Sequence, residues 1–421
     1  FFQTFINPHD SEQTFESAWT QFASEAISRS ELVDQFSPPN EEPIVVPRFK
    51  NGIVFSAVES FFGLIQESVE AGSSFLFETH PGPDDEPATH PKAILTTFAF
   101  GVLPTVIFFA ALMSVLYYLG VMQKLIRAMA WVMEKTLRTS AAESMAAAAN
   151  VLVGHTEAPL VVKPYVPQMT RSELNALMVG GFATISGSLM AIFANIGVSA
   201  GHLLTASLIS APAALVIAKI LQPETEDTTD LAVSEAKMEN EACNVIEAAA
   251  NGATEGMKLA LNIGAMLIAF LALIMFLDIC LQTIGGWIGL EISLSLVFGA
   301  FFYPFAWIMG IAAQDCWIAG DLLGKKLVVN EFLAYIEMSS IPTRTGDNTE
   351  GISERTRTIL TYALCGFSNF GAIGIQLGGI GPLAPDRKSD LAQLGLRAMF
   401  GGAIAAAMTA CIAGIFYGLL A

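Results

Sequence analysis

Charged residues are scarce in this chain. Of its 421 residues, 14% are Asp, Glu, Lys or Arg and 53% are hydrophobic, and the mean hydropathy is +0.54. A soluble protein carries roughly 25% charged residues, so the composition excludes an ordinary soluble domain. Several stretches carry no charge and are long enough for spans of about 20 residues: 93–119, two spans between 173 and 219 that turn at 197–201, 259–277 and 398–420. The sequence predicts a polytopic α-helical membrane protein.

Cysteine and histidine are few, and neither gathers into a cluster. The five cysteines form no CxxC pair and lie mostly in apolar segments, which predicts small buried side chains rather than disulfides or a metal centre. The five histidines are scattered, and the chain contains no HExxH motif. These absences argue against an intramembrane enzyme, so we expect neither catalysis nor a cofactor.

Basic residues are outnumbered by acidic ones, 21 to 39, which gives a net charge of −18 and argues against nucleic-acid binding. The acids gather in 10–42 and 224–241, which we expect to be solvated segments outside the bilayer. The bases gather in 124–171 and at 387–388, and placing these in the cytoplasm puts residues 1–92 and the C-terminus outside. Because the chain begins with Phe1 rather than Met, we expect further residues upstream, spans among them.

The stretch Asn150–Pro159 reads NVLVGHTEAP, which places a histidine and a glutamate in apolar surroundings. Ser140 and Glu143 have capping-box spacing, so we expect a helix to begin there. Pro159 fits the first turn of a second helix, and this helix returns to water near Pro167. Too few residues are available for two crossings. We therefore predict a re-entrant hairpin with Gly154, His155, Thr156 and Glu157 at its tip, near mid-membrane.

A second hairpin is predicted over 315–342, with Asn330 and Glu331 at its centre. A helix with a weak point follows each hairpin, at 180–187 and at 366–371, where glycine and small polar residues allow the helix to unwind.

The same order of elements occurs twice. A span, an interfacial helix, a hairpin, a broken helix and a span are expected in 93–222 and again in 258–421. Residues 122–137 have an apolar and a charged face, typical of an interfacial helix, and symmetry suggests the same for 292–311. The predicted fold is an all-α polytopic membrane protein with inverted structural repeats, two re-entrant helical hairpins, two discontinuous helices and interfacial helices. Such repeats are typical of secondary transporters.

The remaining segments complete the predicted organisation. They are an acidic extramembrane N-terminal segment (1–50), an interfacial helix and loop (51–92) and an acidic cytoplasmic loop (223–257).

Six segments resemble the concentrative nucleoside transporter family: Asn150, Gly154–Leu160, Gly181–Ile185, Pro223–Glu226, Asn330–Phe332 and Cys365–Phe370. They occur in the family's order, and the resemblance extends from about residue 53 to the C-terminus. It implies a multi-pass protein of the cell (inner) membrane that imports nucleosides. It also implies a homotrimer whose protomers each have a scaffold and a moving transport domain.

The polar midplane residues suit a nucleoside. A carboxylate accepts from two adjacent sugar hydroxyls, as an acidic residue does at a dinucleotide ribose, so we assign Glu331 to the ribose, with Asn369 beside it. His155, Thr156 and Glu157 would meet the base edge next to Gly154. The resemblance implies the same roles and adds Leu189 and Phe367 as apolar walls. Structural alternatives exist: Glu157 and Glu331 paired with lysine or backbone, and Phe367 as a core residue.

A coupling ion is also expected. Sodium requires several oxygens, and Asn150 and Thr184 offer side-chain oxygens while Val153 and Ile185 offer carbonyls at the helix breaks. Sodium coupling is therefore favoured. Proton coupling through Glu157, Glu331 or His155 is the alternative, and a channel or an intramembrane enzyme is less favoured. Thr184 has a structural alternative too, a bond to the carbonyl four residues earlier.

Two departures from the family pattern are visible. Ala372 stands where the family often has serine, so we expect one fewer hydrogen bond to ribose. His155 stands where most relatives have glutamine.

Overall fold

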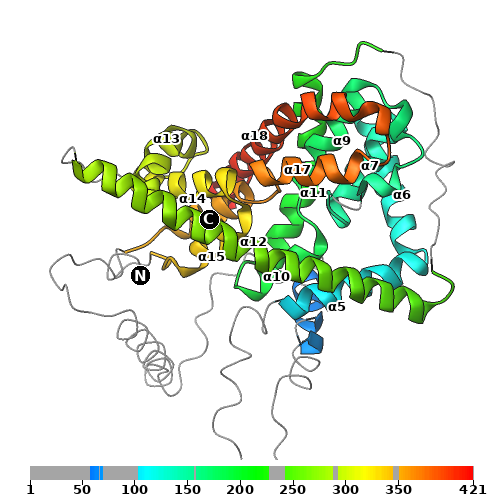
Figure 1. Ribbon diagram of the computed structural model, residues 1–421, viewed down its shortest axis with the longest axis horizontal. Coiled ribbons are helices and arrows are strands. Elements are labelled where there is room, and N and C mark those ends of the chain that lie inside the picture. The colour runs from blue at the N-terminus through cyan, green and yellow to red at the C-terminus, as the bar shows by residue number, and fades with distance from the viewer. Residues whose placement is uncertain are drawn as a thin grey trace, which may run out of the picture. The chain divides into compact units, whose positions relative to one another are not determined.

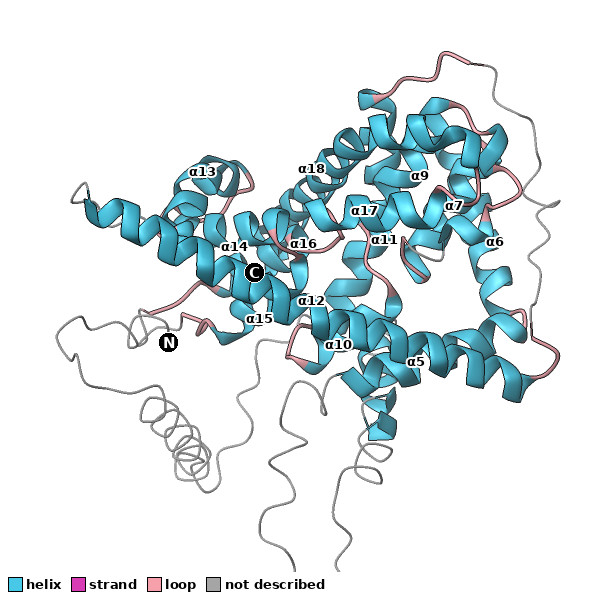
Figure 2. Ribbon diagram, in the orientation of Figure 1, coloured by secondary structure: helices cyan, strands magenta, loops and turns pink. Residues whose placement is uncertain are grey.

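The computed structural model describes residues 57–65, 67–69, 103–155, 158–226, 242–287, 293–344 and 350–420. These residues belong to one compact unit and form helices without a strand (Figure 2). The all-α prediction is confirmed. The acidic N-terminal segment, Thr156 and Glu157 lie outside the described residues.

The first repeat contains the expected elements in the expected order. They are α5 (Leu103–Tyr118), α6 (Val121–Leu137), α7 (Ala141–Leu152), α8 (Ala158–Val161), η2 (Val166–Gln168), α9 (Arg171–Ala183), α10 (Gly187–Asn195) and α11 (Ala200–Leu221). Helices α7 and α8 form hairpin 1, and α7 begins with the predicted capping box of Ser140 and Glu143. Helices α9 and α10 form the first broken helix. Helix α6 turns 78° away from α5, as an interfacial helix after a span would.

The second repeat has the same order. It consists of α12 (Val245–Trp287), α13 (Leu294–Ile308), α14 (Cys316–Val328), α15 (Glu331–Ser340), α16 (Glu354–Ala363), α17 (Phe370–Ile380), η4 (Pro385–Arg387) and α18 (Lys388–Leu420). Helices α14 and α15 form hairpin 2, and α16 and α17 form the second broken helix. Hairpins and breaks therefore occur at the predicted places in both repeats.

Three helical segments of the described residues are long and apolar enough to cross a membrane: 171–195, 200–221 and 385–418. Helix α12 contains the expected span 259–277 but is longer, with 43 residues. Its length of about 65 Å exceeds a hydrocarbon core of about 30 Å. The segment expected to be a loop up to residue 257 is helical from Val245 onward, because this extension packs on α5.

The two hairpins enter from opposite ends of the molecule. Directly before α18, Arg387 of η4 donates to the carbonyls of Pro167 and Met169 beside the end of hairpin 1. Near the end of α18, Arg355 donates to the carbonyl of Gly414, beside the end of hairpin 2. These points are about 40 Å apart along a helix, more than the hydrocarbon thickness. This geometry is that of inverted repeats.

A polar cluster ties hairpin 1 to α11. Lys219 pairs with Glu143 at 2.5 Å and with Glu224 at 3.4 Å, and the Thr170 hydroxyl donates to Glu224. Glu224 follows the last turn of α11, outside the span. Burial raises the pKa of its carboxyl, but the hydrogen bonds from Thr170 and the Glu226 N–H and the charge of Lys219 lower it more. At the opposite end, Arg344 pairs with the buried Asp315 at 2.7 Å.

Glycines allow α12 and α5 to pack backbone to backbone. A methyl group on Gly252 would lie 2.6 Å from the carbonyl oxygen of Ala110, and one on Gly256 would lie 2.7 Å from the Cα of Ile107. This small-xxx-small spacing is typical of membrane helix contacts. Figure 1 shows α12 running along α5 and on towards α13, and α12 contacts both helices. The close contact explains why α12 continues as a helix beyond the predicted span.

We expect Gly256→Ala to lower the free energy of unfolding by about 1–3 kcal/mol, because the added methyl has no space against α5. Gly286→Ala is the matched control in the same helix, since a methyl there meets no atom within 4 Å and alanine favours the helix. Melting of the detergent-purified variants measures the effect. Equal melting temperatures for the two variants would contradict the close α5–α12 contact.

Candidate functional site

The tip of hairpin 1 rests on the break in the first broken helix. Gly154 has φ +86°, and a methyl group there would lie 2.6 Å from Cβ of Ser186. Ser186 caps α10 by accepting from the Leu189 N–H. Only glycine fits both the positive φ and this close approach. Gly154 therefore brings the tip of hairpin 1 directly against Ser186 in the first break.

The two helix breaks contact each other at the same place. Gly366, with φ +100°, lies in the unwound segment of the second broken helix, and a methyl group there would lie 2.6 Å from the carbonyl oxygen of Phe182. The next residue, Phe367, places its ring 4.1 Å from the His155 ring, centroid to centroid. The structure thus brings together His155 and Phe367, which are 212 positions apart in the chain.

Glu331 and Asn369 form the polar pair that the sequence placed side by side. The Asn369 Oδ1 accepts from the Ala372 N–H at 2.8 Å and caps α17. Its Nδ2 therefore points to Glu331, where it donates to Oε2 at 3.0 Å. Glu331 is 4% exposed and begins α15 at the tip of hairpin 2. The caps of two helices fix this carboxylate and this amide in place.

The residues expected to hold sodium lie around the end of α7. Asn150 is 1% exposed, and its Nδ2 donates to the Leu177 carbonyl at 3.4 Å while its Oδ1 has no partner in the described structure. Val153 caps α7, and Ile185 lies buried in the first break. The Thr184 hydroxyl donates to the Gly180 carbonyl at 2.9 Å. This is the bond to the carbonyl four residues earlier that we named as the structural alternative to a sodium role. The Thr184 oxygen keeps lone pairs that can ligate an ion.

Several buried polar atoms at this junction have no partner among the described residues. They are Asn150 Oδ1, both ring nitrogens of His155, Ser368 Oγ and Gln376 Oε1. Buried polar side chains are normally hydrogen-bonded, so such a group of unpaired atoms indicates where a polar ligand or water binds. The hairpin 1 tip and the two breaks therefore form the candidate site.

Leu189 lies on α10, one turn before Phe193. The Phe193 ring packs 4.4 Å from the Tyr335 ring of α15, so this face of α10 turns towards hairpin 2. Leu189 is buried there and belongs to the same hydrophobic core as Phe367. Thr156 and Glu157, at the tip of hairpin 1, lie outside the described residues, so their predicted roles are carried forward as proposals.

Two residues at the junction have no predicted role. Gln376 on α17 is 1% exposed, and its Nε2 donates to the Met178 carbonyl at 3.2 Å. Lys326 on α14 is 3% exposed and donates to the carbonyls of Ala363 and Cys365. The sequence offered one signal for both residues: each is a polar side chain within an apolar segment of a hairpin or a broken helix, and such residues are often functional.

The spacing GxSxG occurs at residues 197–201, yet its serine has a structural role. Ser199 caps α11 by accepting from the His202 N–H, and its hydroxyl donates to Glu59 at 2.7 Å. The His202 ring contacts the Tyr362 hydroxyl instead, at 3.1 Å. A nucleophilic serine needs an imidazole base within hydrogen-bond reach, whereas the Ser199 hydroxyl is used by the Glu59 carboxylate and the His202 backbone N–H.

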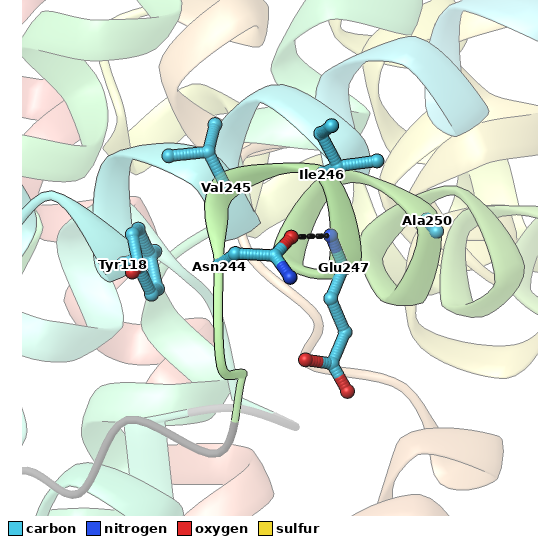
Figure 3. A pocket seen from close by; sticks show the side chains of 6 residues that line it. All are labelled: Tyr118, Asn244, Val245, Ile246, Glu247 and Ala250. Atoms are coloured by element: carbon cyan, nitrogen blue, oxygen red, sulfur yellow. Dashed lines mark hydrogen bonds between the residues drawn. The ribbon is translucent and has the colours of Figure 1, made fainter.

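An open pocket lies elsewhere, between the end of α5 and the start of α12 (Figure 3). Tyr118, Asn244 and Glu247 are among its lining residues, and Asn244 accepts from the Glu247 N–H at the first turn of α12. This contact is a helix cap, and the pocket shares no residue with the junction of the breaks. We therefore do not assign the ligand to this pocket.

Comparisons with known proteins agree with this geometry. A family model described as "Na+ dependent nucleoside transporter C-terminus" matches residues 202–414, and one described as "Nucleoside recognition" matches 99–200. An uncharacterized transporter of Haemophilus influenzae is 48% identical over 76% of this chain and 77% of its own length. Sodium/nucleoside cotransporter 1 of Mus musculus is 42% identical over 83% of this chain and 53% of its own.

The fold also matches solved structures. The structure of CNTnw in an inward-facing substrate-bound state aligns with a TM-score of 0.80 and 40% identity, over 89% of this chain and 87% of that chain. Fold and site define a membrane transporter built on two inverted repeats, and not an enzyme. The chain belongs to the concentrative nucleoside transporter family. It spans about half the length of the mammalian relatives that it matches.

We expect Asn369→Ser to weaken nucleoside binding by about 1–2 kcal/mol, because serine can still cap α17 but loses the hydrogen bond to the Glu331 carboxylate. Asn330→Ser is the control, since Asn330 caps α15 in the same way by accepting from the Leu333 N–H. Binding of labelled uridine to both purified variants measures the difference. Equal losses in the two variants would show that capping alone matters.

Proposed function

We propose that this protein is a sodium-driven symporter that imports nucleosides across the cell (inner) membrane. The observation that carries the proposal is the buried Glu331–Asn369 pair, located where two unwound helices and the His155–Phe367 contact meet. Relatives named as sodium/nucleoside cotransporters support the same activity.

The two sides of this junction match the two parts of a nucleoside. Glu331 can accept from the adjacent hydroxyls of a ribose, and Asn369 orients its carboxylate. Both ring nitrogens of His155 have no partner among the described residues. Together with Thr156 and Glu157, His155 would provide donors and acceptors for a base edge. Phe367 and Leu189 supply apolar walls for the flat base.

Sodium is the coupling ion that these residues fit best. Asn150 Oδ1 is buried and has no partner within the described ranges, and Val153, Thr184 and Ile185 add oxygens at the break. A hard cation of this kind is bound by carbonyl and side-chain oxygens. The family description supports sodium as well. Proton coupling through Glu157, Glu331 or His155 is the alternative.

Alternating access would follow from the inverted repeats. The closely packed α5 and α12 suit a scaffold, while the hairpins and broken helices suit a transport domain that moves against it. We propose a homotrimer, as the family resemblance implies. The solved structures of CNTnw that this chain resembles include an inward-facing and an outward-facing state.

Uptake into proteoliposomes tests the function directly. Labelled uridine and adenosine are supplied under an imposed sodium gradient, a proton gradient in choline, or no gradient. We expect saturable accumulation only with the sodium gradient. Equal accumulation with the proton gradient alone would establish the alternative, and unsaturable equilibration without a gradient would indicate a channel.

Glu331→Gln should weaken uridine binding by about 1–3 kcal/mol, because the neutral amide is a poorer acceptor for two hydroxyls. Glu337→Gln is the matched control on the same helix, since Glu337 pairs with Lys325 away from the junction. Uridine dissociation constants of the purified variants measure the effect. Wild-type affinity in Glu331→Gln would remove the ribose assignment.

Asn150→Ala and Thr184→Ala should raise the sodium concentration for half-maximal uptake more than they change uptake at saturating sodium, because each removes one ligand oxygen. Thr409→Ala is the control for the second variant. Thr409 is also fully buried and also donates to a backbone carbonyl, that of Ala406, but it lies on α18. A shift in Thr409→Ala as large as in Thr184→Ala would assign Thr184 a purely structural role.

A further inference from the structure

Lys326 holds an ammonium group at the end of α16. It lies on α14, two residues before that helix ends, and is 3% exposed. Its Nζ donates to the carbonyls of Ala363 at 2.8 Å and Cys365 at 3.0 Å. Ala363 is the last residue of α16, and Cys365 lies in the unwound segment after it. The last carbonyls of a helix carry partial negative charge and lack intrahelical donors, so a cation is favoured here.

Counting from helix ends relates Lys326 to a residue of the first repeat. Asn150 lies two residues before the end of α7, as Lys326 does before the end of α14. The first break begins after Ala183, so Ile185 holds the position that Cys365 holds after Ala363. The candidate sodium ligands Asn150 and Ile185 thus correspond to Lys326 and Cys365.

The two positions differ in charge and in hydrogen bonding. Asn150 is neutral, and its side-chain oxygen has no partner in the described structure. Lys326 carries its own positive charge and already contacts two carbonyls of the second break. A cation at the first break must come from solution, whereas the second break has one covalently attached.

We propose that the Lys326 ammonium is a built-in cation, which takes in the second repeat the place that sodium takes in the first. This inference rests on the proposed sodium coupling. Its consequence is that each protomer carries one sodium ion from solution per nucleoside. The second site does not empty during the cycle, because its cation is part of the chain.

Lys326 also acts as a positioning residue for the ribose side of the site. It fixes the start of the unwound segment that continues through Phe367 to Asn369, and it lies five residues before Glu331 on the same hairpin. Hairpin 2 therefore contacts the second break at two points. Lys326 binds the beginning of the break, and Glu331 accepts from Asn369 at the end of the break.

The test replaces the Lys326 side chain either by one that offers an oxygen ligand or by one that offers no ligand. Lys326→Asn puts at this position the residue type that stands at 150, and Lys326→Met keeps much of the length but offers no oxygen. Sodium-dependent uridine uptake and sodium-dependent melting are measured for both variants at constant ionic strength, with choline replacing sodium. Lys325→Asn and Lys325→Met are the controls, because the neighbouring Lys325 pairs with Asp321 and Glu337 instead.

We expect both Lys326 variants to lose uptake about tenfold or more at moderate sodium, since two buried carbonyls lose their donor. High sodium should restore uptake and melting temperature in Lys326→Asn, with a Hill coefficient for sodium that rises from about 1 towards about 2. Lys326→Met should not be restored. The Lys325 variants should keep the sodium dependence of the wild type.

Three results would overturn the proposal. Sodium dependence in Lys326→Asn that equals that of Lys325→Asn would show that no second cation site opens. Equal recovery of Lys326→Met would show a general salt effect. The wild type provides a test that does not depend on the folding of a variant. Parallel fluxes of sodium-22 and labelled uridine should give one sodium ion per nucleoside. A ratio of two would contradict the proposal. If uridine uptake by the wild type did not depend on sodium, the proposed sodium coupling would be refuted, and this inference would fail with it.

Discussion

Every backbone polar group inside a bilayer needs a partner in the protein, because no water is available there. The two helix breaks of this fold expose such groups near the middle of the chain's apolar bundle. Side chains satisfy some of them: Ser186 and Asn369 cap the restarted helices, and Lys326 binds the carbonyls of the second break. Gly366 lets the breaks approach each other. In the part of the chain that the structure describes, polar atoms of Asn150, His155, Ser368 and Gln376 stay without a partner, and these are the atoms that we propose for the cargo and its ion.

The repeats share an order of elements but not a chemistry. Hairpin 1 presents Asn150 and His155 among the described residues, whereas hairpin 2 presents the oppositely charged Lys326 and Glu331. A buried carboxylate is costly unless a positive charge and donors compensate it. Lys326 supplies the charge nearby, and Asn369 supplies a donor. The second repeat can therefore bury the carboxylate that we propose for the ribose, and the first repeat carries the cation site that we propose for sodium.

Local signals in the sequence predicted the hairpins and breaks well. The Ser140–Glu143 capping box forms as expected, and the breaks occur where glycine and small polar residues cluster. The Glu331–Asn369 contact was also expected, because both lie at the polar centre of adjacent predicted elements. The partners of Lys326 could not be predicted in this way, since Ala363 and Cys365 are distant in sequence and only tertiary packing brings them near. The extension of α12 was missed for the same reason: its glycines fit α5, and that fit is not a local property.

The sodium role proposed for Thr184 is compatible with the structural role that its hydroxyl has. Its hydroxyl hydrogen is used by the Gly180 carbonyl, while the lone pairs of the same oxygen stay available to an ion. In the proposed mechanism the site must alternate between loaded and empty forms. A ligand whose position depended on the ion would lose its geometry each time the ion left. The bond to Gly180 keeps Thr184 in place without the ion, so the empty break remains ready to bind sodium again.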